Sequence, residues 1–208
     1  EEYIEMIRLK TSVLLACALK LGAVLADAPQ SDADALYAFG EKMGLAFQLQ
    51  DDYLDVYGDF KVFGKKIGGD ILCNKKTFML INALAKADGK MREELERWLE
   101  ATDYVPEDKV AAVTRIYNEL NIPQLALDKI NSYFEEAKIA LESVQVPDEK
   151  KAYLWSEALL AVSVNWMFSP NGCRSKIVKL SLTSMCAPST LAVLLDWRHL
   201  VRSNIQLL

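Results

Sequence analysis

Apolar residues recur along most of this chain with the period of a helix. Between residues 3 and 26 they return every three or four positions, as in an amphipathic helix. A second helix is expected to start at the N-cap Ser31, with Asp34 three residues on, and to include residues 36–57. Similar patterns predict helices at 76–87, 91–101, 107–120, 123–143 and 148–168. Because no segment alternates convincingly like a strand, we predict an all-α fold, an antiparallel helical bundle.

Prolines and one glycine-rich break separate these segments. Pro29 is expected to end the first helix, and Pro106 and Pro123 stand at or near helix starts, where proline is favoured. The longest break is residues 58–74, which are rich in glycine and lysine. Loops of this length inside compact domains are often functional, so this one is a candidate binding segment.

The composition is that of a globular protein without a membrane span. The chain has 208 residues, of which 51% are hydrophobic and 25% charged, with a net charge of −5 that argues against nonspecific nucleic-acid binding. The longest apolar run, Val13 to Leu25, is interrupted by Lys20 and is too short to cross a bilayer. The four cysteines have no metal-type spacing, and Cys17 falls on an apolar helix face. We therefore expect a cytoplasmic protein in a reducing environment.

The end of the chain differs from the rest in charge and composition. Residues 169–208 hold five Lys/Arg and one acid, whereas residues 1–168 hold 19 Lys/Arg and 28 Asp/Glu. The helical pattern also gives way there to a Ser/Thr/Cys-rich sequence with weak periodicity. We predict a helical domain at 1–168 and an atypical tail at 169–208, which we interpret as a non-native or frameshifted end. The only histidine, His199, lies in this tail, which disfavours histidine-based acid–base catalysis.

The most informative stretch is residues 47–55, which read FQLQDDYLD. In a helix, Asp51 and Asp55 stack on one face, with Asp52 rotated by about 100° beside them and Gln48 one turn earlier. Carboxylates crowded in this way repel one another, which favours a bound cation. Magnesium is the natural candidate, because it prefers oxygen ligands and is usually held by one or two carboxylates together with phosphates. The alternative is an ordinary solvated acidic face.

A basic segment follows the acidic one. Lys65, Lys75 and Lys76 lie in or beside the glycine-rich loop, from which they can offer positive charge to a phosphate group. The alternative is a soluble loop in which Gly68-Gly69 forms a simple turn. Asp70 suits the cap of a short helix as well as it suits a ligand contact.

Taken together, these residues resemble the trans-type (E-type) polyprenyl diphosphate synthases, the family of farnesyl and geranylgeranyl diphosphate synthases. The resemblance covers about residues 3–168. It rests on Lys10-Thr11, the second aspartate-rich motif within 47–55, Gly58-Asp59, Gly64-Lys65, Gly68-Gly69-Asp70 and Asn74-Lys75. A lone DDxxD is weak evidence, but this ordered set is specific. It implies the isoprenoid synthase (class I terpenoid synthase) fold and a homodimer.

The resemblance also implies a reaction, the Mg2+-dependent head-to-tail condensation of an allylic diphosphate with isopentenyl diphosphate. Breaking the allylic carbon–oxygen bond leaves a cation and a highly charged leaving group, so catalysis needs positive charge that binds the departing diphosphate. The implied metal ligands are Asp51 and Asp55, assisted by Asp52. The residues implied to face the allylic diphosphate are Lys10, Thr11, Gln48, Lys65 and Lys75.

Two features of the family are missing from this sequence. No other DDxxD and no Gly-Lys-Arg segment occurs, and only nine residues precede Lys10. We therefore expect a bundle that is incomplete at its N-terminus and inactive alone. The residues that set product length in the family are missing as well, so the sequence does not predict the product. Two alternatives stay open. One is a noncatalytic helical subunit or inactive fragment, and the other is a class I terpene cyclase, which the DDYLD sequence at 51–55 disfavours.

Overall fold

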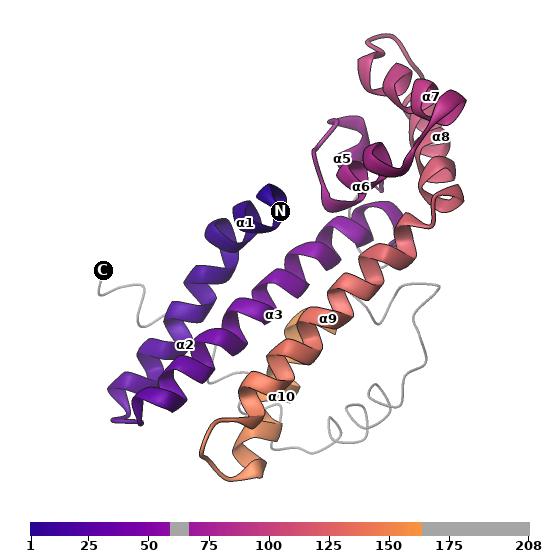
Figure 1. The fold of residues 1–208 in the computed structure, drawn as a ribbon. Coiled ribbons are helices and arrows are strands. Elements are labelled where there is room, and N and C mark those ends of the chain that lie inside the picture. Colours follow the sequence, from indigo (N-terminus) through magenta and orange to yellow (C-terminus); the bar gives the residue numbers. More distant parts are fainter. Residues whose placement is uncertain (59–66, 164–208) are drawn as a thin grey trace. The chain divides into compact units, whose positions relative to one another are not determined.

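A computed structural model describes residues 1–58 and 67–163, all of which belong to one compact unit. These residues form helices and no strand, which confirms the all-α prediction for this part of the chain. The elements are α1 (Glu2–Ile7), a π-helical turn η1 (Arg8–Ser12), α2 (Val13–Leu25), α3 (Gln30–Tyr57), α5 (Gly69–Leu72), α6 (Phe78–Lys86), α7 (Gly89–Glu100), α8 (Pro106–Glu119), α9 (Ile122–Glu142) and α10 (Asp148–Ser163) (Figure 1). None of these helices is long and apolar enough to cross a bilayer. The predicted tail at 169–208 lies outside the described residues.

The 28-residue helix α3 organises this unit. It packs along α2 and η1 on one side and along α9 on another. Both α2 and α9 run antiparallel to α3 (Figure 1). The short helices α5 and α6 and the pair α7–α8 lie around the C-terminal end of α3 (Figure 1). Asp51, Asp52 and Asp55 of α3 therefore lie at the end of the helix where most of the other elements meet.

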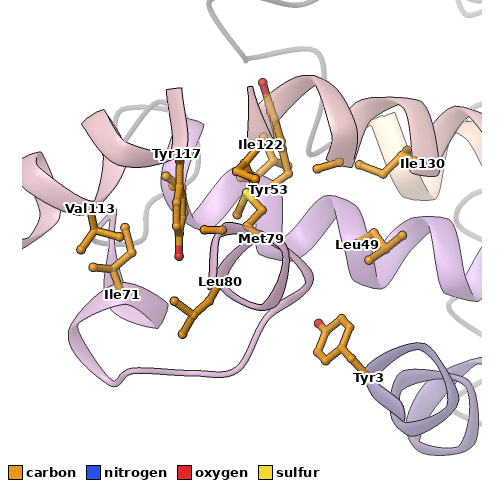
Figure 2. Close-up of a cluster of buried hydrophobic side chains, with 14 of the residues drawn as sticks. Tyr3, Leu49, Tyr53, Ile71, Met79, Leu80, Val113, Tyr117, Ile122 and Ile130 are labelled. Carbon is orange, nitrogen blue, oxygen red and sulfur yellow. The ribbon is translucent and has the colours of Figure 1, made fainter. Parts of the chain in front are cut away.

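The main core lies at that same end of the helix. It combines side chains from α1, α3 and the segment from α5 to α9. Figure 2 shows Val113 and Tyr117 of α8 beside Ile71 of α5 and Leu80 of α6, while Tyr3 approaches from α1. This core fixes the position of α5 and of the chain that leads from it into α6.

Small residues permit a close contact between α3 and the first helices. A Cβ added at Gly40 would lie 2.9 Å from Ala16 Cα, and one at Gly44 would lie 2.7 Å from Ser12 Cα. Ser12 and Ala16 are themselves completely buried. The two backbones therefore approach too closely for any larger side chain on α3.

The first helical segment differs from its prediction in two ways. It contains the π-helical turn η1 between α1 and α2, where one regular helix was expected. The apolar residues of this segment also do not all lie on a buried face. Leu14 and Leu25 are each 77% exposed, and Cys17 is exposed as well. Periodicity identifies an apolar face but not its partner, and α3 packs against the small residues Ser12 and Ala16 instead.

The start of α3 also differs from the prediction. Its N-cap is Pro29 rather than Ser31, because the extended ψ of 146° at Pro29 turns its carbonyl toward the N–H of Asp32. Asp34 closes no capping box, since its carboxylate accepts a hydrogen bond from Lys20 Nζ at 2.6 Å. The fixed φ of proline suits a helix start, although Pro29 offers no side-chain acceptor to the first turn.

The later helices start and end close to the predicted positions. Pro106 is the first residue of α8 and Pro123 the second of α9, as expected. The predicted break at 58–74 contains the short helix α5, one of the two possibilities that the sequence offered for the region of Asp70. The last predicted helix, 148–168, is described as far as Ser163.

The close contact leads to a prediction about stability. Replacing Gly44 with alanine should lower the free energy of unfolding by about 1–3 kcal/mol, because the new methyl group overlaps Ser12. Gly22 of α2 is the matched control, since nothing lies within 4 Å of its added Cβ. Gly22→Ala should instead stabilise the chain by about 0.5–1 kcal/mol through helix propensity. Urea denaturation checks both, and a Gly44→Ala variant as stable as the parent would contradict the packing.

Candidate functional site

The acidic residues occupy the last two turns of α3. Asp52 and Asp55 are only 4% and 6% exposed, whereas Asp51 is half-buried. Residues three and four apart in a helix share a face, so Asp55 lies one turn beyond both of the others. A buried carboxylate is unfavourable unless other groups compensate its charge, and the partners of each therefore decide what the site can do.

Asp52 receives hydrogen bonds from two distant parts of the chain. The Tyr3 hydroxyl donates to one carboxylate oxygen, and Lys75 Nζ donates to the other at 3.1 Å. Burial raises the pKa of Asp52, and the two donors oppose that rise because they favour the ionised form. Burial and the neighbouring Asp52 charge raise the pKa of Tyr3, which keeps its hydroxyl protonated as a donor.

Lys75 connects two carboxylates. Its Nζ also donates to Asp70 Oδ2 at 2.7 Å, so one amine bridges Asp52 of α3 and Asp70 of α5. Burial lowers the pKa of Lys75, but the hydrogen bonds and charges of the two aspartates outweigh it and raise the pKa above its usual value. The side chain remains 43% exposed. A charged amine is therefore held next to solvent in an acidic setting.

Asp55 joins the end of α3 to the start of α5. Its Oδ2 accepts the backbone N–H of Asp70 at 2.8 Å, and its carbonyl oxygen accepts the N–H of Gly68 at 2.6 Å. Gly68 has φ +84°, and a Cβ there would lie 2.7 Å from Val110 Cγ2, so glycine is required at this turn. Gly68, not Asp70, is the N-cap of α5, and Asp70 instead pairs with Lys75.

The other predicted ligand-binding residues lie nearby on η1 and α3. Lys10 is exposed, and Thr11 and Gln48 are half-buried. Lys10 and Thr11 belong to the π-helical turn, a distortion that often occurs at functional sites. Among the described residues, no recorded hydrogen bond or ion pair joins these three side chains to the aspartates. Lys65 lies outside the described residues.

The donor set agrees with a magnesium ion only in a limited way. Within residues 1–58 and 67–163, no three acidic, histidine or cysteine side chains are placed to hold a metal ion by themselves. One or two carboxylates nevertheless suffice for Mg2+ when phosphates and waters supply the other ligands. The aspartates of α3 fit a metal that a bound diphosphate completes, and do not fit a closed site made of protein alone.

Tyr3 is the member of this network that the sequence analysis missed. It stands seven residues before Lys10, a spacing that puts two residues on one side of a regular α-helix, but the π-helical turn intervenes, and Tyr3 is buried whereas Lys10 is exposed. Its partner Asp52 is 49 residues away in the chain. No local pattern connects residues at that separation.

Comparison with known proteins identifies the family. Residues 1–120 match the family model described as polyprenyl synthetase. The chain belongs to the polyprenyl synthetase family. This membership confirms the resemblance drawn from the motifs between Lys10 and Lys75.

Individual members of the polyprenyl synthetase family extend the match. A short chain isoprenyl diphosphate synthase of Methanothermobacter thermautotrophicus is 38% identical over 152 residues, which are 73% of this chain and 46% of that protein. The crystal structure of a geranylgeranyl pyrophosphate synthase has a TM-score of 0.71 and 35% identity, covering 78% of this chain and 50% of that one. A Corynebacterium glutamicum geranylgeranyl pyrophosphate synthase, complexed with isoprenyl diphosphate and magnesium, has a TM-score of 0.68 and 28% identity, covering 79% and 48% of the two chains.

These matches establish the fold and its extent. The described helices have the all-α isoprenoid synthase fold of the polyprenyl synthases, as the motifs implied. The chain spans about half the length of the relatives that it matches.

The partners of Asp52 lead to a prediction about pH. Replacing Tyr3 with phenylalanine should lower the free energy of unfolding at neutral pH by about 1.5–3 kcal/mol, because a buried carboxylate loses a donor. The hydrogen bond favours ionised Asp52, so its contribution is full above the pKa of Asp52 and declines as the pH falls through it. Because that pKa is raised, the decline should begin at a higher pH than for an ordinary aspartate.

Tyr57→Phe is the matched control. The Tyr57 hydroxyl donates to the neutral amide oxygen of Asn118 in an exposed position, so its loss should be smaller and should not vary with the ionisation of Asp52. Urea denaturation between pH 4 and pH 7 measures both variants. A Tyr3→Phe loss that stays constant over this range would contradict the assigned hydrogen bond.

Proposed function

We propose that this chain carries the diphosphate-holding wall of a polyprenyl diphosphate synthase. The proposed reaction of the whole enzyme is the condensation of an allylic diphosphate with isopentenyl diphosphate. The observation that carries the proposal is the bridge from Lys75 to Asp52 and Asp70, which holds a charged, solvent-accessible amine between one buried and one half-buried carboxylate. A diphosphate that binds together with a cation matches both kinds of group.

The proposed roles rest on the resemblance to the polyprenyl diphosphate synthases, and the contacts of Asp52, Asp55 and Lys75 support part of them. Magnesium, when bound with a diphosphate, neutralises the charge of the leaving group. The proposed metal-holding residues are Asp51 and Asp55, with Asp52 assisting. The proposed diphosphate-binding residues are Lys10, Thr11, Gln48, Lys65 and Lys75. The hydrogen bond from Tyr3 favours the ionised form of Asp52, and Asp55 also fixes the N–H of Asp70, so part of the acidic cluster maintains the shape of the site.

We also propose that the chain forms a homodimer, and that the exposed apolar side of α2 contacts other protein. Leu14, Leu21 and Leu25 expose a row of large apolar side chains on that helix. Apolar surface of this kind is typical of interaction sites.

A cytoplasmic location is proposed as well. Within the described residues Cys17 and Cys73 form no disulfide, in keeping with a reducing environment.

Calorimetry on the 208-residue chain tests the metal and diphosphate assignments. Magnesium alone should bind weakly, and pyrophosphate should tighten its binding, because phosphate oxygens complete the ligand set. Asp51→Asn and Asp55→Asn should each weaken the binding of magnesium pyrophosphate by about tenfold, or ~1.4 kcal/mol. Asparagine keeps an acceptor for the N–H of Asp70, so the fold is preserved better than with alanine.

Asp128 of α9 provides the control for this experiment. Its carboxylate accepts a hydrogen bond from Gln124 within an exposed helix turn, and Asp128→Asn removes the same charge outside the proposed site. This variant should bind magnesium pyrophosphate like the parent. Parent-like binding by both Asp51→Asn and Asp55→Asn would refute the metal assignment.

A turnover assay addresses the reaction itself. With magnesium, an allylic diphosphate and labelled isopentenyl diphosphate, the chain alone should give no elongated product, because its sequence holds one DDxxD motif and no Gly-Lys-Arg segment. Release of a hydrocarbon that does not require the labelled isopentenyl diphosphate would instead indicate a terpene cyclase. Elongated product would show that the aspartates of α3 suffice without a second acidic motif.

A further inference from the structure

Lys109 of α8 is completely buried, which is unusual for a lysine. Its Nζ donates to Asn74 Oδ1 at 2.7 Å and lies 4.4 Å from the centre of the Tyr104 ring. Its two partners among the described residues are thus an amide oxygen and an aromatic ring, and neither is a carboxylate. Burying a lysine against such partners is unfavourable for stability, since an apolar side chain fills the same space without losing hydration.

Asn74, the partner of Lys109, has a backbone conformation that needs support. Its φ of +51° lies in the left-handed region, which non-glycine residues adopt at some cost. Two side-chain hydrogen bonds hold it there. Its Oδ1 accepts from Lys109, and its Nδ2 donates to the carbonyl oxygen of Leu99 at 2.8 Å. Asn74 is thereby attached to α7 and α8, which belong to the core.

Asn74 directly precedes Lys75, whose amine bridges Asp52 and Asp70. The backbone of Lys75 is fixed on both sides, since its N–H donates to the carbonyl oxygen of Asp70 at 2.9 Å and its own carbonyl accepts the N–H of Thr77 at 2.7 Å. The turn at Asn74 sets the direction in which the chain enters this short stretch. A side chain that fixes Asn74 therefore fixes where the Lys75 amine can reach.

We propose that Lys109 is a positioning residue that acts through Asn74 to hold Lys75 in its bridge between Asp52 and Asp70. For ligand binding, this inference rests on the proposed function, because Lys75 is the group that would contact the diphosphate. The placement of Lys75 itself does not depend on that function. The two parts are tested by separate measurements.

The first measurement uses no ligand. Acetic anhydride acetylates lysine amines that it can reach, so the Lys75 amine, held between Asp52 and Asp70, should react more slowly than that of its exposed neighbour Lys76. Mass spectrometry gives the ratio of the two rates within one molecule. Lys109→Met should raise the Lys75/Lys76 ratio by about threefold or more, because the loss of a hydrogen bond behind Asn74 frees the Lys75 amine from its bridge.

Lys129→Met is the matched control for this substitution. Lys129 Nζ also lies 4.4 Å from the centre of a tyrosine ring, that of Tyr133, on a different helix. The same lysine–ring contact is lost, but no turn next to Lys75 is involved. The Lys75/Lys76 ratio should stay at the parent value in this variant, and a rise equal to that of Lys109→Met would overturn the proposal.

A second variant guards against misfolding. Lys109→Met alone leaves the Asn74 oxygen without its donor, and Asn74→Gly combined with it removes both partners while glycine keeps the positive φ. The double variant should retain the helical circular dichroism of the parent and should show the raised ratio. A folded double variant with the parent ratio would show that Lys109 does not position Lys75.

The second measurement is a double-mutant cycle on magnesium pyrophosphate binding by calorimetry. Lys109→Met should weaken binding by about tenfold in the parent chain, as substitutions behind ligand-contacting groups do. In the Lys75→Ala background the same change should alter binding by less than about twofold. Equal weakening in both backgrounds would assign Lys109 a merely structural role. A parent chain that binds no magnesium pyrophosphate would count against the proposed function, while the acetylation ratio would still decide the role of Lys109.

Discussion

The carboxylate of Asp52, buried near the end of α3, is the constraint on which the surrounding structure depends. Its two donors come from the first helix and from the chain between α5 and α6. Lys75 carries the connection on to Asp70, and the N–H of Asp70 carries it back to Asp55. Three segments that are far apart in sequence are held together because one charge needs partners in a poorly solvated place.

The same side of α3, about two turns earlier, determines where the remaining candidate residues lie. Gly44 brings the backbone of α3 against Ser12, the last residue of η1. Gln48 follows Gly44 by four positions and therefore shares its face, next to the turn that contains Lys10 and Thr11. The close helix contact thus brings Lys10 and Thr11 of η1 up to the helix that carries Gln48 and the buried aspartates, which explains why α3 tolerates glycines despite their low helix propensity.

Much of the fold was predictable because helix formation leaves a local signal. Apolar spacing and the prolines at 106 and 123 located most helices, but spacing could not tell that α3 would pack on Ser12 and Ala16 while Leu14 and Leu25 stay exposed. The site was predictable in its residue types and not in its contacts. The crowding of Asp51, Asp52 and Asp55 indicated a nearby cation, and in the described structure a lysine supplies positive charge to Asp52. The pairing of Tyr3 with Asp52 depends on tertiary structure alone.

The lysine bridge changes what the acidic cluster requires of a ligand. A cation that arrives alone competes with Lys75 for Asp52 and leaves the amine with one carboxylate fewer. An anion that arrives alone draws Lys75 away and leaves the buried Asp52 with less compensation. Only a ligand that brings both charges can satisfy Asp52 and Lys75 at once. Selectivity for a metal–diphosphate pair over either ion therefore follows, under the proposed function, from the burial of one aspartate and the reach of one lysine.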